Sequence, residues 1–215
     1  MIKIKDLTKI IGSHCILNNI NMEIATGTTT GIIGRNGSGK TVLLKCICGL
    51  YEPTNGEILF QKDNCAKCVS SSGLIGAVID SPGFLPNISG YKNLEYLSQI
   101  RNIPKDSIRH AMIEVGLDPK NRQPVKHYSL GMKQRLGIAQ VIMDNPDILI
   151  FDEPTNGLDN ELVVTFHKLV HTQHAKHKTI IIASHSKEDI AILCDCVYEL
   201  DAGKIININV KKEGQ

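Results

Sequence analysis

The sequence predicts an α/β fold in which a mostly parallel sheet is covered by helices on both faces. Short apolar runs typical of buried strands alternate with segments of helical spacing, as in parallel sheets whose strands are joined by helices. A glycine-rich segment, residues 34–41, links one such strand to a helix. Another apolar run, residues 148–151, ends in two acidic residues. Because ligands bind at the carboxyl ends of the strands in such sheets, we expect both features at one edge.

Two kinds of strand are predicted from the spacing of apolar residues. The buried strands of the parallel sheet are expected at residues 30–33, 74–79, 148–151, 179–183 and 197–200. Alternating apolar and polar residues predict a flanking, mostly antiparallel β subdomain, with strands at residues 2–8, 17–24 and 56–60.

Residues 90–145 show no strand pattern and are predicted to form an inserted helical subdomain. The helical spacing i, i+3, i+4, i+7 is clearest at Ile108, Ala111, Met112 and Val115. A further helix is expected at residues 162–170. We expect one domain over residues 1–215, since this length supports one substantial core. Its predicted parts are the α/β core with its β subdomain, residues 1–79 and 146–215, and the helical subdomain, residues 80–145.

Charge and composition narrow the class of protein. The 24 basic and 22 acidic residues nearly balance, so nothing in the composition calls for a nucleic-acid partner. No run of 18 apolar residues is present, and residues 1–6 alternate like a strand, unlike a signal peptide. Seven cysteines form an odd set, which favours reduced thiols. We therefore expect a cytoplasmic protein.

The glycine-rich segment predicts a nucleotide site. It reads Gly-Arg-Asn-Gly-Ser-Gly-Lys-Thr and fits the phosphate-binding pattern G-x-x-x-x-G-K-[ST] at every fixed position. Its glycines let backbone N–H groups turn onto phosphate oxygens, at the positive end of the helix that follows. Lys40 is expected to reach the outer phosphates, and the Thr41 hydroxyl to bind Mg²⁺. The residues predicted to hold the nucleotide here are Gly34, Asn36, Gly37, Ser38, Gly39, Lys40, Thr41 and Val42.

The acidic pair after residues 148–151 predicts the chemistry. Asp152 is expected to hold the hydrated Mg²⁺, and Glu153 to orient and deprotonate the attacking water. Other metal patterns are weak. Cys65 and Cys68 form a lone C-x-x-C pair, which we expect to bind no zinc. Four histidines could align on one helix edge, but a polar helix terminus is the favoured interpretation for His167, His171, His174 and His177.

Further motifs give the sequence a family resemblance. Residues 128–135 read Tyr-Ser-Leu-Gly-Met-Lys-Gln-Arg, residues 152–155 read Asp-Glu-Pro-Thr, residues 157–159 read Gly-Leu-Asp and residues 183–186 read Ala-Ser-His-Ser. With the phosphate loop, these five motifs stand in the order seen in the ATP-binding cassette (ABC) ATPases, which the chain resembles over nearly its whole length.

The resemblance implies a head-to-tail homodimer with two ATP molecules at its interface. The phosphate loop of one subunit and the signature residues Ser129 and Gly131 of the other would hold each ATP. A serine at a helix N-terminus is itself a suitable anion site. The resemblance also implies that His185 contacts the γ-phosphate and that Asp159 makes a contact across the dimer.

The sequence departs from the family pattern at three places. Tyr128, Leu130 and Met132 replace the usual residues of the signature. Ile11 stands where an aromatic residue usually stacks on adenine, with His14 nearby as an alternative. Asp80 replaces a glutamine, and its carboxylate can bind the metal. Residues 80–91 and 128–135 look like the cassettes of bacitracin-type and lantibiotic self-protection.

The resemblance implies an ATPase subunit of a membrane exporter, on the inner face of the cell membrane, that removes a peptide antibiotic or related amphiphile. A separate permease would dock near residues 84–96. A rival interpretation is a cytosolic ATPase that clamps nucleic acid or ribosomes. Such relatives carry two cassettes or a long coiled coil, and this sequence has neither. A small-molecule kinase is disfavoured by the signature and the acidic pair.

Overall fold

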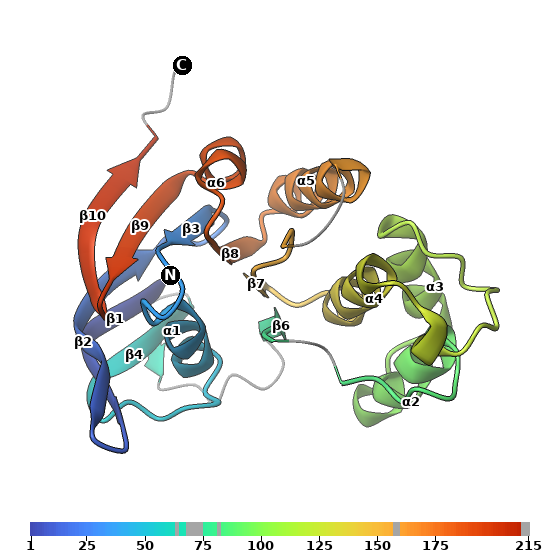
Figure 1. Ribbon diagram of the computed structural model, residues 1–215, viewed down its shortest axis with the longest axis horizontal. Helices are drawn as coiled ribbons and strands as arrows, with labels where there is room; N and C mark the ends of the chain where they lie inside the picture. The colour runs from blue at the N-terminus through green and yellow to red at the C-terminus, as the bar shows by residue number, and fades with distance from the viewer. Residues whose placement is uncertain (63–64, 68–74, 81–82, 157–159, 212–215) are drawn as a thin grey trace.

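The computed structural model describes residues 1–62, 65–67, 75–80, 83–156 and 160–211. Its centre is a six-stranded sheet in the order β10-β9-β3-β8-β7-β6 (Figure 1). All neighbouring strands pair in parallel except β10, which runs antiparallel to β9. The strands are β3 (Thr29–Ile33), β6 (Ile75–Val78), β7 (Ile148–Asp152), β8 (Thr179–Ser184), β9 (Cys196–Asp201) and β10 (Lys204–Val210). The predicted mostly parallel sheet is confirmed.

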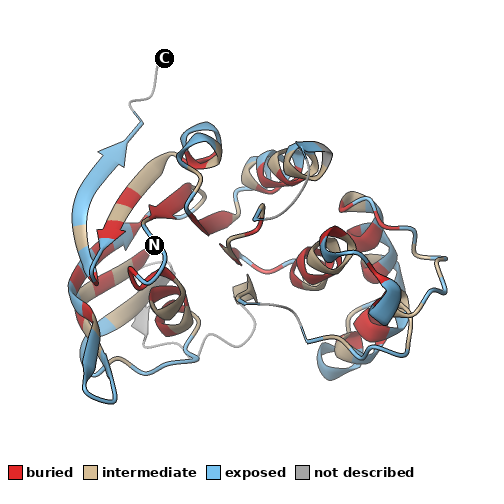
Figure 2. Cartoon of the chain, in the orientation of Figure 1, coloured by how far each residue is buried: buried red, intermediate tan, exposed pale blue. Residues whose placement is uncertain are grey.

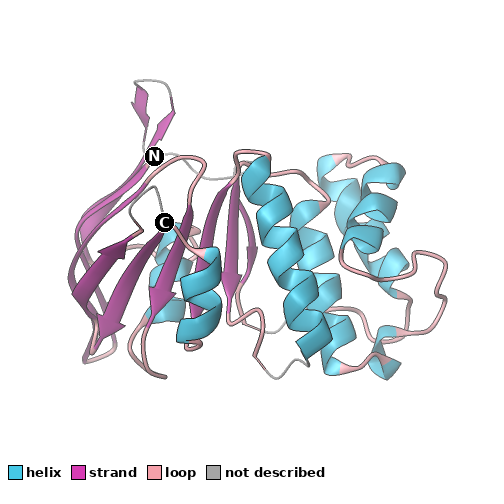
Figure 3. Ribbon diagram, turned by 90° about the horizontal axis from the view of Figure 1, so that it is seen from above, coloured by secondary structure: helices cyan, strands magenta, loops and turns pink. Residues whose placement is uncertain are grey.

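An antiparallel sheet in the order β2-β1-β4-β5 lies beside the first, as expected from the alternating N-terminal pattern. Its strands are β1 (Ile2–Ile11), β2 (His14–Ile24), β4 (Asn55–Lys62) and β5 (Cys65–Lys67). Helix α1 (Lys40–Ile47) follows β3 and shares one apolar core with this sheet. Figure 3 shows the two sheets at one end of the molecule, with helices next to their strands, and a larger group of helices at the other end.

The central sheet is buried on both faces because successive residues of its strands point to opposite sides. In β7, Ile148 and Ile150 pack with α1 and the antiparallel sheet, whereas Leu149 and Phe151 pack with the helices of the opposite face. That face carries α5 (Asn160–Ala175) and α6 (Lys187–Leu193). In Figure 2 the middle strands are correspondingly coloured as buried. Apolar runs without alternation are the expected result in the sequence.

Residues 90–145, all of which the structure describes, contain helices and no strand, as predicted. They form α2 (Gly90–Arg101), α3 (Lys105–Glu114), a 3-10 turn (Val125–His127) and α4 (Leu130–Ile142). Figure 1 shows these helices together, with α4 nearest the central sheet. No helix in the described part of the chain has the length and apolar composition that a bilayer crossing requires. The boundaries of the subdomains, at residues 79/80 and 145/146, stay predictions.

Helix α6 and the strands β5 and β10 were missed, and α5, β1 and β2 were predicted too short. Helix α6 has only seven residues and begins with Lys187, Glu188 and Asp189, so it shows little apolar spacing. Strand β10 lies at the sheet edge, where exposed isoleucines alternate with asparagines and give no buried-strand pattern. Helix α5 extends beyond the predicted residues 162–170 because its polar flanks continue the same helix.

The two-sided burial of β8 predicts a large cost for truncating one of its side chains. Ile181 is fully buried on the α1 face, so Ile181→Ala should lower the free energy of unfolding by about 2–5 kcal/mol. Ile206 on the edge strand β10 is 60% exposed. Ile206→Ala should therefore change the free energy of unfolding by less than about 0.5 kcal/mol. Denaturant unfolding of both variants measures the difference. Equal losses would contradict the placement of these two strands.

Candidate active site

The phosphate-loop sequence lies between β3 and α1, in the predicted strand, loop and helix order. Gly37 and Gly39 adopt φ values of 78° and 108°, which favour glycine. A Cβ on Gly34 would lie 2.2 Å from the carbonyl oxygen of Leu200. All three glycines are therefore required by the local backbone. Ser38 is buried, Asn36 is exposed, and the helix begins at Lys40.

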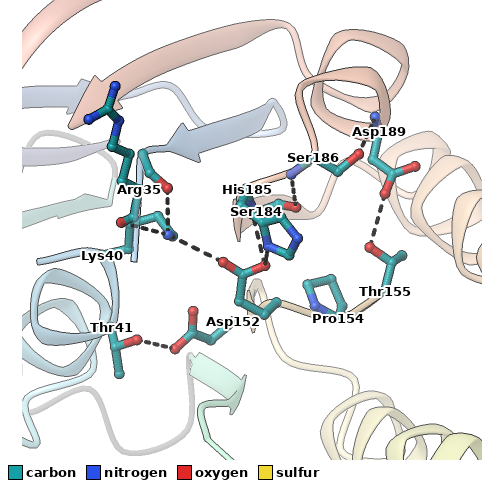
Figure 4. A network of polar contacts seen from close by, with 12 residues as sticks. Arg35, Lys40, Thr41, Asp152, Pro154, Thr155, Ser184, His185, Ser186 and Asp189 are labelled. Atoms are coloured by element: carbon teal, nitrogen blue, oxygen red, sulfur yellow. Dashed lines mark hydrogen bonds and ion pairs between the residues drawn. The ribbon is translucent and has the colours of Figure 1, made fainter. Parts of the chain in front are cut away.

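Lys40 is the buried cation of this loop, with 6% of its side chain exposed. Its Nζ donates a hydrogen bond to the carbonyl oxygen of Gly34 at 2.8 Å and a longer one to that of Arg35 at 3.4 Å. The same Nζ lies 3.3 Å from Oε1 of Glu153 (Figure 4). A buried ammonium group needs such partners because its transfer from water is costly. These contacts hold the Lys40 ammonium group at the loop, beside the carboxyl end of β7.

Thr41 and Asp152 meet at the same edge, as expected. The Thr41 hydroxyl donates a hydrogen bond of 2.6 Å to Oδ2 of Asp152 (Figure 4). Oδ1 of Asp152 and the hydroxyl of Ser38 are buried and have no hydrogen-bond partner among the described residues. Burial raises the pKa of the Asp152 carboxyl, and the hydrogen bond from Thr41 opposes this effect. A hydroxyl and a carboxylate with a free oxygen fit a Mg²⁺ ion, which prefers oxygen ligands.

Glu153 and His185 form the other half of the cluster. Nδ1 of His185 lies 2.7 Å from Oε2 of Glu153, and the backbone N–H of His185 donates to the same oxygen at 3.3 Å. Glu153 adopts a positive φ of 48°, and its N–H donates to the carbonyl oxygen of Ala183 at 2.8 Å. The carboxylate thus has one oxygen toward Lys40 and the other toward His185. Positive φ in a non-glycine residue is uncommon and often marks a functional turn.

A network behind this cluster was not predicted. The Thr155 hydroxyl donates to Oδ2 of Asp189 at 2.9 Å (Figure 4). Nε2 of His167 lies 2.9 Å from Oδ1 of the same carboxylate. Asp189 lies in the first turn of α6 and His167 in the middle of α5. The interpretation of His167 as part of a polar helix terminus is therefore wrong. The network ties the segment after Glu153 to both helices.

Gln134 of α4 makes a second unpredicted contact with that segment. Its Nε2 donates hydrogen bonds to the carbonyl oxygens of Glu153, at 3.1 Å, and Pro154, at 2.8 Å. Gln134 lies in the signature motif, but the sequence does not indicate which atoms its side chain contacts. The turn that carries Glu153 is therefore in contact with the helical region as well as with β8.

Asp80 lies just after β6 and forms an ion pair that the sequence did not reveal. Its Oδ2 lies 2.7 Å from Nζ of Lys45 on α1, and its side chain is 60% exposed. The hydrogen bond to Asp80 raises the pKa of the Lys45 ammonium group. The pKa of Asp152, which burial raises most, is also raised by the negative charges of Glu153 and Asp80. Its role as a metal ligand stays a prediction.

The remaining predicted residues lie on other elements of the fold. Ile11 ends β1, is 43% exposed and pairs with His14 across the hairpin. Ser129 is exposed and caps α4 by accepting a hydrogen bond from the Met132 N–H at 3.2 Å. Gly131 is buried in the first turn of that helix. In Figure 1, α4 and α1 lie on opposite sides of β6 and β7. Val42 is half-buried in α1, whereas Asp159 and Cys68 lie outside the described residues.

Comparisons with known proteins agree with this arrangement. Residues 17–156 match the model of the family described as ABC transporter. An uncharacterized ABC transporter ATP-binding protein of Bacillus subtilis, YybJ, is 41% identical over 206 residues, which cover 95% of this chain and 94% of that protein. The lantibiotic transport ATP-binding protein SrtF of Streptococcus pyogenes is 36% identical, with 96% and 89% covered.

Two further likenesses extend this finding. The bacitracin transport ATP-binding protein BcrA of Enterococcus faecalis is 36% identical over 219 residues, which cover 99% of this chain and 70% of that protein. The dimeric structure of MJ0796, a bacterial ABC transporter cassette, shares the fold with a TM-score of 0.87, covering all of both chains at 24% identity. The family match and the relatives together show that this chain belongs to the ABC transporter family, as an ATP-binding subunit with ATPase activity.

Proposed function

We propose that this ATPase powers the export of a peptide antibiotic or similar amphiphile through a separate membrane permease, and so protects the cell that makes or meets the compound. The observation that carries the catalytic part is the Glu153 carboxylate, held between Lys40 and His185 beside the paired Thr41 and Asp152. The substrate class is supported by the relatives named for lantibiotic and bacitracin transport, and by the motif resemblance.

In the proposed site, ATP binds with its phosphates on the loop of residues 34–41. The N–H groups of the loop and the positive end of α1 face the phosphate oxygens. Lys40 exchanges its present carbonyl partners for the outer phosphates. This exchange is favourable because a phosphate oxygen carries more negative charge than a carbonyl oxygen. Thr41 and Asp152 would hold Mg²⁺, which neutralises charge on the β- and γ-phosphates.

Glu153 is proposed as the group that orients and deprotonates the attacking water. Its Oε1 is buried and accepts no hydrogen bond from the described residues, although Nζ of Lys40 lies 3.3 Å away; once Lys40 turns to the phosphates, this oxygen would be open to that water. His185 is proposed to contact the γ-phosphate. Its ring already lies at hydrogen-bond distance from Glu153, so the base and this contact lie on the same side of the site.

A complete site is proposed to need two subunits in a head-to-tail dimer. Ser129 and Gly131 at the start of the 13-residue helix α4 would reach the ATP held by the partner's loop, and Asp159 would contact the partner. An exposed helix N-terminus with a serine cap is suited to bind an anion. Ile11, or His14 opposite it, is proposed to contact adenine.

The membrane permease is the proposed partner, with the ATPase on the inner face of the cell membrane. The relatives named for transport support this partner and do not favour a clamp on nucleic acid or ribosomes. Residues 84–96 are proposed as the docking surface. They include the start of α2, whose cap Ser89 accepts a hydrogen bond from the Lys92 N–H. Asp80 precedes this segment in the sequence, and its side chain pairs with Lys45 of α1.

The role of Glu153 predicts a variant that binds ATP but does not hydrolyse it. Glu153→Gln keeps the side-chain size and removes the base, so hydrolysis should fall by roughly 100-fold or more while binding changes little. The ATP-bound dimer should then accumulate, which size-exclusion chromatography with and without MgATP detects. Glu57→Gln, a matched change at an exposed residue of β4, should leave the rate and the elution volume unchanged.

A Glu153→Gln variant that still turned over at a substantial fraction of the wild-type rate would remove Glu153 from the role of base. A variant that lost hydrolysis but stayed monomeric with saturating MgATP would instead contradict the proposed dimer.

Asp80 is proposed to act through Mg²⁺ or its bound water, because an ionised carboxylate facing the γ-phosphate would otherwise be repelled. Asp80→Asn should therefore weaken the dependence of the ATPase rate on Mg²⁺ and change ATP affinity little. Transport or resistance should fall more than basal hydrolysis. Lys45→Met breaks the same ion pair but keeps the carboxylate, and it should leave the Mg²⁺ dependence nearly unchanged.

Magnesium titrations of the ATPase rate, run beside a resistance assay, separate the alternatives. If Asp80→Asn and Lys45→Met shift the magnesium dependence equally, Asp80 acts through Lys45 and its assignment to the metal is wrong.

A further inference from the structure

Helix α4 contacts the turn that carries Glu153, the proposed base, through the side chain of Gln134. Gln134 lies five residues after Ser129 on this helix, and its Nε2 donates to the carbonyl oxygens of both Glu153 and Pro154. A primary amide carries two N–H donors, so one side chain satisfies both carbonyls. Being neutral, it adds no charge beside the Glu153 carboxylate.

The position of the Glu153 carboxylate depends on this turn. Glu153 has a positive φ, and its backbone is held by its own N–H on the carbonyl of Ala183 and by the Asn156 N–H on its carbonyl oxygen. Pro154, the next residue, is buried. Gln134 adds the contact between this turn and α4, so a shift or rotation of α4 would either move the turn or break two hydrogen bonds.

We propose that Gln134 is a positioning residue that couples the two nucleotide sites of the dimer. This inference rests on the proposed function, in which Ser129 of one subunit binds the ATP held by the other. The first turn of α4 then responds to the partner's nucleotide, while Gln134, on the same helix, holds the Glu153 turn of its own subunit. Binding of ATP at one site therefore places the base of the other.

The physical basis is the rigidity of a short helical segment. Ser129 and Gln134 are separated by little more than one helical turn, about 7.5 Å along the axis, so they move together. Catalysis by a positioned base is sensitive to geometry, and a displacement of about 1 Å can cost roughly 100-fold in rate. A coupling contact of this kind should affect turnover and cooperativity and leave the affinity of a single site for ATP largely unchanged.

Gln134→Met tests the proposal because methionine keeps the length of the side chain and removes both donors. We expect kcat to fall by about 10- to 100-fold and the Hill coefficient for ATP to fall toward one. The Kd for ATP, measured on the monomer below the concentration for dimerisation, should change by less than about twofold. Gln140→Met makes the same substitution near the other end of α4 and is expected to match the wild type in all three measurements.

Three outcomes would overturn the coupling: a wild-type Hill coefficient of one, a Gln134→Met variant with wild-type kcat and Hill coefficient, or a loss of kcat with the Hill coefficient retained. Thermal melting shows whether the variant is folded. If the Gln134→Met variant is not folded, hydrogen exchange of the Glu153→Gln protein replaces the kinetic test. There, MgATP should slow exchange at α4 and at Asn156 together, and protection of α4 alone would overturn the proposal.

The same data separate this inference from the proposed function. Failure of the Glu153→Gln protein to dimerise with MgATP would contradict the dimer itself. A dimer that forms normally, together with an unaffected Gln134→Met variant, would contradict only the role of Gln134.

Discussion

The structure depends most on the hydrogen bonds and the ion pair that stabilise the charged side chains of Lys40, Asp152 and Glu153 at the carboxyl ends of the parallel strands. Each is partly or fully removed from water, and each would be costly there without partners. Lys40 is satisfied by loop carbonyls and by Glu153, and Asp152 by Thr41. Buried oxygens of both carboxylates nevertheless accept no hydrogen bond from the described residues. Such a cluster suits a ligand that brings phosphate and a divalent cation together.

The sheet makes this cluster possible through its strand order. Strands β3, β8 and β7 are neighbours and run in parallel, so the phosphate loop, His185 and the acidic pair leave the sheet at the same edge. Burial on both faces fixes the strands, and their positions in turn fix the side chains at their ends. Positive φ values at Gly37, Gly39 and Glu153 allow the chain to turn at the carboxyl ends of these strands. The core therefore provides the rigidity that the site requires.

Local patterns allowed much of the site to be predicted. The fixed glycines, Lys40 and Thr41 follow from a continuous motif, and the acidic pair from its place after a buried strand. The contacts made by Lys45, Gln134 and Asp189 did not follow, because each joins residues 19 or more positions apart and depends on how helices pack. Strand β10 was missed for a related reason: an edge strand keeps exposed side chains and lacks the apolar run that marks a buried one.

The central claim is that the cluster of Lys40, Asp152 and Glu153 at the carboxyl ends of the parallel strands binds nucleotide phosphates together with Mg²⁺. Differential scanning calorimetry of the wild-type protein and Lys40→Met, with ATP in the presence of either Mg²⁺ or a chelator, tests it most directly. For the wild type, MgATP at 100 times its Kd should add about 2.7 kcal/mol to the free energy of unfolding, and ATP with the chelator clearly less. Lys40→Met should lose most of this stabilisation. Equal stabilisation with and without Mg²⁺, or none in the wild type, would contradict the claim.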